Sequence, residues 1–172
     1  DDMSYGECQD DLNRICDNIE GCTGDTALAL TLISDNSFFM EVKKNYEPSM
    51  VTGFIRLNGT TIGCVANRTE IYENGEKKET FEPVLSGKGC DKATDFIHFC
   101  DAFNIPVLTL VNVKGYKACK CTERRIAKNA GRLTYAFANA SVPKVTVVTG
   151  EAFGTAYLTM NSKSIGADMV YA

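Results

Sequence analysis

The 172-residue chain has one histidine, no tryptophan and no apolar run near the roughly 18 residues that a membrane-spanning helix needs. His98 lies between apolar residues of a predicted helix, so we expect a structural histidine of the core rather than part of a Ser-His-Asp triad. The phosphate-binding pattern GxxxxGK(S/T) is absent, which argues against a P-loop nucleotide-binding protein. The net charge of -4 argues against a nucleic-acid-binding protein.

Cysteine is abundant by contrast, with eight residues. Cys64, Cys90 and Cys100 lie in apolar segments, where free cysteine behaves as a small buried hydrophobic residue. Cys119 and Cys121 form a CxC pair, but no second pair and no nearby histidine complete a zinc set, so we expect no metal site. The first residues are acidic and polar, unlike a secretory signal peptide, so we expect a reducing, cytoplasmic setting.

The chain divides into a polar start and one larger unit. Residues 1–24 are polar and weakly periodic, and indicate an N-terminal arm or linker before a domain over 25–172. Asp25 is the expected cap of a short helix over 26–34. The pair Asn58-Gly59 between two apolar runs predicts a β-hairpin over 50–67.

The second half alternates apolar strands with amphipathic helices. Its predicted elements are an Asp91-capped helix to 103, a strand over 105–113, a helix over 122–140, a strand over 144–149, a helix over 153–162 and a strand over 167–171. Helices between strands permit right-handed crossovers and a parallel sheet. Because the first half is hairpin-like and 70–82 predicts a loop or an exposed hairpin, the predicted fold class is mixed α/β.

Two glycine-containing segments follow the predicted parallel strands, at the edge where ligands gather in such sheets. They are 113–116 and 150–156, and the second leads into a helix. The first amides of a helix have no internal partners and can stabilise an oxyanion. Two interpretations of Gly154 stay open here: it leaves room for a ligand oxygen, or it permits close packing of the helix on the sheet. The basic cluster around Arg124, early in the 122–140 helix, is interpreted as a solvated face.

Several long motifs occur in one order over residues 10–172. They are 51–59 (VTGFIRLNG), 63–67 (GCVAN), 90–93 (CDKA), 99–111 (FCDAFNIPVLTLV), 142–145 (VPKV), 152–157 (AFGTAY), 160–163 (MNSK) and 166–168 (GAD). In this order they resemble the C-terminal half of carboxyltransferase subunits of biotin-dependent acyl-CoA carboxylases and decarboxylases. The resemblance implies a crotonase-like α/β fold, a ββα spiral with parallel central strands, here truncated at its C-terminus.

The resemblance also implies what the whole enzyme does. In that family the subunit moves a carboxyl group between carboxybiotin and an acyl-CoA, and the biotin is attached to a separate carrier protein. The N-terminal half binds the acyl-CoA, the C-terminal half faces the biotin, and the active site forms between halves of different subunits of a homo-oligomer. A membrane is involved only through a partner subunit, in sodium-pumping decarboxylases. This chain matches the biotin-facing half, so we expect it to be inactive alone.

The same resemblance assigns site residues. The backbone amides of Thr155 and Ala156 correspond to the biotin-side oxyanion hole, and the remaining substrate-binding or biotin-binding positions are Gly115, Tyr116, Gly154 and Leu158. Three features depart from the family pattern. Thr155 replaces a glycine of Gly-Gly-Ala, Lys114-Gly115-Tyr116 replaces Pro-Gly-Phe, and Leu158 replaces an acidic residue, which leans toward a decarboxylase or a larger acyl group.

Two alternatives remain open. Another crotonase-type enzyme, a hydratase or isomerase, needs a glutamate pair near the oxyanion site, and Glu151 alone is a poor candidate. A non-catalytic assembly domain is suggested by the cysteine-rich start of the chain and by its apparent truncation.

Overall fold

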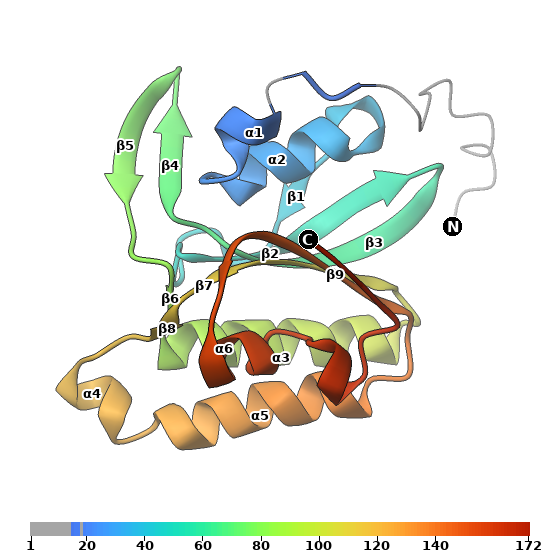
Figure 1. Cartoon of the computed structure of the whole chain (residues 1–172). Coiled ribbons are helices and arrows are strands. Elements are labelled where there is room, and N and C mark those ends of the chain that lie inside the picture. The colour runs from blue at the N-terminus through green and yellow to red at the C-terminus, as the bar shows by residue number, and fades with distance from the viewer. Residues whose placement is uncertain (1–14, 18) are drawn as a thin grey trace.

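The computed structural model describes residues 15–17 and 19–172, except for the side chain of Cys121. A six-stranded sheet forms the centre of the molecule (Figure 1). Its strands, in sheet order, are β1 (Met40–Glu41), β2 (Met50–Leu57), β3 (Thr60–Asn67), β7 (Val107–Val113), β9 (Lys144–Ala152) and β10 (Met169–Tyr171). β1, β2 and β3 are antiparallel neighbours, whereas β3, β7, β9 and β10 run parallel.

Helices cover both faces of this sheet (Figure 1). α3 (Gly87–Ala102), α5 (Ile126–Asn139) and α6 (Gly154–Thr159) lie on one face, and α1 (Ile19–Cys22) and α2 (Thr26–Ile33) lie on the other. Two small sheets complete the strands: β4 (Glu70–Glu73) pairs with β5 (Glu76–Thr80), and β6 (Val84–Leu85) pairs with β8 (Gly115–Tyr116). The remaining elements are α4 (Lys120–Glu123) and 3-10 turns at Asp35–Ser37 and Lys163–Ile165.

The local signals explain several of these elements. Asn58 and Gly59 have φ angles of 50° and 78°, the positive values that a tight hairpin turn requires, and they join β2 to β3 as predicted. Asp25 accepts a hydrogen bond from the amide of Ala27 and caps α2, as predicted. Asn74 and Gly75 make a similar turn, so the charged segment after β3 is an exposed hairpin.

The core consists of one hydrophobic cluster on each face of the sheet. Cys64, Cys90 and Cys100 are all buried, as the apolar pattern predicts. Burial raises the pKa of the Cys90 and Cys100 thiols to about 12, so both stay protonated near neutral pH. The expectation for His98 is wrong, because its side chain is exposed on the solvent side of α3.

Several predicted boundaries differ from the structure. α3 begins at Gly87 rather than after Asp91, because the Ser86 hydroxyl accepts a hydrogen bond from the amide of Gly89 and caps the helix there. The predicted 122–140 helix is two helices, α4 and α5, because Arg125 has non-helical backbone angles. Thr122 does not cap a helix; its hydroxyl is 2.9 Å from the Cys119 thiol.

The last part of the chain also departs from the prediction. The strand predicted to end at Thr149 continues to Ala152, so the first residues of the glycine segment belong to β9. α6 ends at Thr159 instead of continuing to Ser162. Asn161 explains this end, since its backbone has a φ of 54° and its buried amide donates to the hydroxyl of Thr146 on β9.

Candidate functional site

The two glycine segments lie side by side at the carboxyl ends of β7 and β9. Val113 pairs with Ala152 in the parallel ladder, and the Phe153 amide donates to the Val113 carbonyl at 3.0 Å. α6 therefore starts next to the point where the chain leaves β7. The predicted meeting of these segments at one edge of the sheet is confirmed.

Tyr116 connects the first segment to α6. Its hydroxyl donates to the Thr155 carbonyl at 3.2 Å and is 2.9 Å from the Thr159 hydroxyl, which itself donates to the Thr155 carbonyl. Gly115 and Tyr116 form β8, which pairs with β6 and fixes the backbone of the segment. The hydroxyl of Tyr116 is thus engaged with the first turn of α6.

The start of α6 presents free backbone donors. Phe153 precedes the helix and its side chain makes no capping hydrogen bond. Within the described part of the chain, no acceptor binds the amides of Thr155 or Ala156. Such amides carry the positive end of the helix dipole, which favours an anionic or partly negative oxygen. Thr155 and Leu158 are exposed, whereas Ala156 is buried.

Gly154 is required for its backbone conformation. Its φ is +58°, which L-residues with a side chain rarely adopt, and no atom lies within 4 Å of where a Cβ would be. The interpretation that Gly154 permits close packing of the helix on the sheet is therefore wrong. The space where a side chain would begin at this residue is open.

Asn112 supports the same helix start from β7. Its side-chain oxygen accepts a hydrogen bond from the Glu151 amide at 2.9 Å, where the register between β7 and β9 shifts. A Cβ on Gly150 would lie 2.6 Å from this oxygen, so only glycine permits the close approach. Asn112 was not among the site residues expected from the sequence, although a polar residue inside the apolar run 105–113 is the signal that points to it.

Residues 10–172 match the family described as the carboxyl transferase domain. The chain belongs to this family. The match covers the same residues as the motifs in the sequence, and it confirms the carboxyltransferase family that they indicated.

Named relatives of this carboxyl transferase domain are identical to it at more than a third of the aligned residues. Methylmalonyl-CoA decarboxylase subunit alpha of Propionigenium modestum is 36% identical over 173 residues, covering 96% of this chain and 32% of the relative. Propionyl-CoA carboxylase beta chain of Cereibacter sphaeroides is 40% identical over 141 residues, covering 81% of this chain and 26% of the relative. The chain therefore spans about a third or less of the length of these relatives.

A solved structure gives the same result for the fold. A transcarboxylase 12S crystal structure, described as a hexamer assembly with hydrolyzed methylmalonyl-coenzyme A bound, has a TM-score of 0.82 at 35% identity. The match covers 96% of this chain and 32% of that chain. The crotonase-like α/β fold predicted from the sequence is confirmed. β3 and β7 pair in parallel in the large sheet, and β6, which precedes α3, pairs in parallel with β8 in a small one.

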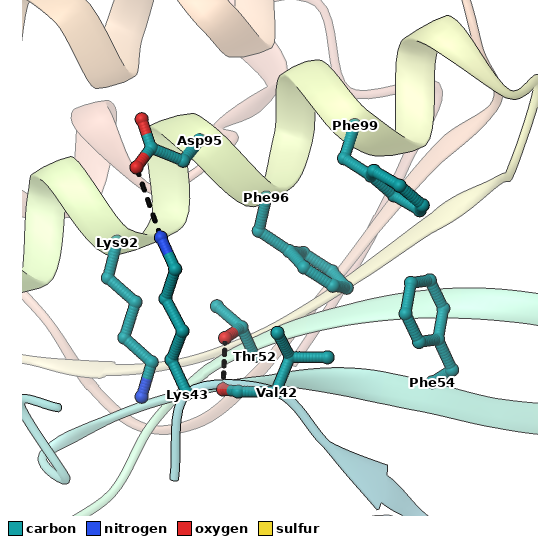
Figure 2. Close-up of a pocket in the computed structure, with 8 residues that line it drawn as sticks. All are labelled: Val42, Lys43, Thr52, Phe54, Lys92, Asp95, Phe96 and Phe99. Carbon is teal, nitrogen blue, oxygen red and sulfur yellow. Dashed lines mark hydrogen bonds and ion pairs between the residues drawn. The ribbon is translucent and has the colours of Figure 1, made fainter. Parts of the chain in front are cut away.

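The carboxyl transferase domain also has an apolar groove between β2 and α3 (Figure 2), and none of the predicted site residues lines it. Its volume is about 300 Å³, and its lining residues are Val42, Lys43, Thr52, Phe54, Lys92, Asp95, Phe96 and Phe99. The Lys92 ammonium donates to the Met50 carbonyl at 2.6 Å, and burial lowers the pKa of Lys92 to about 8. Lys92 therefore joins α3 to β2 inside the protein.

Among residues 15–17 and 19–172, no group of three or more histidine, cysteine, aspartate or glutamate side chains is arranged to hold a metal ion. No helix in the same part of the chain is both long enough and apolar enough to cross a membrane.

Proposed function

We propose that this chain is the biotin-facing part of a carboxyltransferase, in a biotin-dependent acyl-CoA carboxylase or decarboxylase. The observation that carries the proposal is the start of α6, where the amides of Thr155 and Ala156 have no acceptor among the described residues. This start lies at the carboxyl edge of the sheet, in a chain that belongs to the carboxyl transferase domain family. The open space beside Gly154 supports the approach of an oxygen to these amides.

In the proposed mechanism, the amides of Thr155 and Ala156 donate to the ureido oxygen of the biotin that a carrier protein brings. Donors fixed at a helix start would favour negative charge on an oxygen held there, and so would stabilise a transition state that carries such charge more than the ground state. Each such donor contributes about 3–4 kcal/mol in well-studied enzymes. Tyr116 and Gly154 hold and shape the first turn that carries these amides, while Leu158 is exposed two residues beyond Ala156.

In the complete enzyme, we expect this chain to act together with a biotin carrier protein and an acyl-CoA-binding part. The biotin is attached to a carrier protein and not to this chain, and the acyl-CoA is bound by another part of the enzyme. The complete site forms in a homo-oligomer, in the cytoplasm, with a membrane reached only through a partner subunit. Because the chain spans about a third of its relatives, we expect it to show no carboxyl transfer alone.

Substitution at Thr155 tests the oxyanion role in the complete enzyme that contains this chain. Thr155→Pro removes the amide hydrogen, and proline is tolerated in the first turn of a helix. We expect transfer of the carboxyl group from a carboxylated acyl-CoA to free biotin to slow about 100-fold to 1000-fold. Thr155→Gly is the matched control, because it keeps the amide and should retain activity. Unchanged turnover in the proline variant would refute the assigned role.

A further inference from the structure

One segment of the chain concentrates positive charge. Residues 114–132 hold seven of the 18 basic residues but only one of the 22 acidic residues. The segment has a net charge of +6, although the whole chain has a net charge of -4. Such a separation of charge is unusual, since protein surfaces mostly intersperse both signs.

Six basic side chains of this segment are exposed and, among the residues that the structure describes, form no ion pair. We call them the basic surface: Lys114, Lys117, Lys120, Arg124, Arg125 and Lys128. The seventh basic residue, Arg132, pairs with Asp91 at 2.8 Å. Like charges gathered in this way repel one another, and an anionic partner would offset the repulsion.

Three exposed lysines elsewhere in the chain have acidic partners, whereas Lys44 and Lys88 have no ion pair among the described residues. Lys43 pairs with Asp95 on α3, and Lys77 and Lys78 pair with glutamates within the β4–β5 hairpin. The contrast argues against the interpretation of the cluster around Arg124 as an ordinary solvated face. Arg124 and Arg125 also lie at the break between α4 and α5, not inside one long helix.

The basic surface begins at the proposed oxyanion site. Lys114 and Lys117 flank β8, and their amides donate to the carbonyls of Pro83 and Leu85, at 2.8 Å each. Between them lies Tyr116, whose hydroxyl contacts the first turn of α6. The surface continues through α4 to the start of α5, at the end of the molecule where β7 leads into β8 (Figure 1).

We propose that the basic surface docks an acidic face of the protein that carries the biotin. This inference rests on the proposed function and adds the place and the chemistry of docking. The six charges are distributed over the β8 segment, α4 and the start of α5, and so suit an extended acidic protein surface better than the compact phosphates of one CoA molecule. A protein docked there has its attached biotin beside the amides of Thr155 and Ala156.

The test measures association of a biotinylated, acidic carrier domain with the complete enzyme by biolayer interferometry, at low and high salt. The test variant carries Lys120→Glu, Arg124→Glu, Arg125→Glu and Lys128→Glu. The control variant reverses four exposed lysines elsewhere, Lys43, Lys44, Lys77 and Lys78, and so has the same net charge. Glutamine at the four test positions gives a milder variant in case charge reversal impairs folding.

We expect the test variant to associate about tenfold or more slowly at low salt, the glutamine variant to be intermediate and the control variant to resemble the wild type. Equal rates for test variant and wild type would overturn the proposal. A raised KM for acyl-CoA with unchanged carrier association would also overturn it, and would assign the surface to the CoA phosphates. If the wild-type enzyme transfers no carboxyl group to free biotin, that result counts against the proposed function alone. The association rates would still decide whether the basic surface docks the carrier.

Discussion

Tyr116→Phe tests how the first turn of α6 is held in place. The substitution keeps the ring and removes a hydroxyl that donates to the Thr155 carbonyl at 3.2 Å and lies 2.9 Å from the Thr159 hydroxyl. The Thr159 hydroxyl keeps its own hydrogen bond to the Thr155 carbonyl, so no group is left without a partner. The substitution therefore lowers stability only through the lost hydrogen bonding, with no added cost of a buried polar atom that lacks a partner.

A net hydrogen bond contributes about 0.5–1.5 kcal/mol to stability. The Tyr116 hydroxyl has one hydrogen to donate, and its contact with the Thr155 carbonyl is exposed to solvent. We expect Tyr116→Phe to lower the free energy of unfolding by about 1 kcal/mol, which lowers the melting temperature by about 2–4 °C for a domain of this size. Thermal and urea unfolding, followed by circular dichroism, measure both quantities. Tyr135→Phe is the matched control, because Tyr135 is 64% exposed and no hydrogen bond of its hydroxyl is present in the described structure.

Kinetics of the complete enzyme distinguish a positioning role of Tyr116 from a role in binding the substrate. If Tyr116 positions α6, Tyr116→Phe lowers kcat with little change in the KM for the biotin substrate, since the amides are displaced relative to the reacting oxygen. A raised KM with unchanged stability would refute this reasoning, because it would show that the hydroxyl contacts the substrate instead of the helix.

Two further predictions concern Gly154 and Lys92. Gly154→Ala should destabilise the protein by about 1–2 kcal/mol, because alanine must adopt the φ of +58°, although space exists for its Cβ. A variant as stable as the wild type in urea unfolding would contradict this expectation. Lys92→Met should alter the pH dependence of stability. The pKa of Lys92 falls from 10.5 to about 8 on burial, so its charged form is disfavoured in the folded state. Wild-type stability should therefore rise between about pH 8 and pH 10.5, where the unfolded chain holds the extra proton, and this rise should be absent from the methionine variant. Equal slopes of the two proteins in urea titrations over this range would disprove the assignment.

The parts of the fold that local chemistry determines were predictable from the sequence. The Asn58-Gly59 turn and the Asp25 cap depend on neighbouring residues, and both occur where the residue types place them. The parallel order of β7 and β9 followed from the helix between them. The family followed from several motifs in sequence order, and the match over residues 10–172 bears it out.

The features that were missed depend on contacts between distant segments. The end of β9 at Ala152 depends on Asn112, 40 positions away along the chain, and no periodicity within β9 reveals that contact. Burial of His98 was expected from its apolar neighbours, but the way α3 packs on the sheet turns this side chain to solvent. The conformational role of Gly154 likewise required its φ angle, which spacing alone cannot supply.

The attachment of α6 to the chain around β8 has a consequence for how this family can diversify. Three contacts fix the start of the helix: Asn112 to the Glu151 amide, Val113 to the Phe153 amide, and Tyr116 to the Thr155 carbonyl. All three involve backbone atoms on the helix side, so they do not depend on the side chains at the exposed positions of α6 beyond Gly154. Exposed positions such as Leu158 can therefore change while the amides of Thr155 and Ala156 stay in place. If these amides stabilise charge as we propose, the exposed face of α6 can vary under selection without loss of that role.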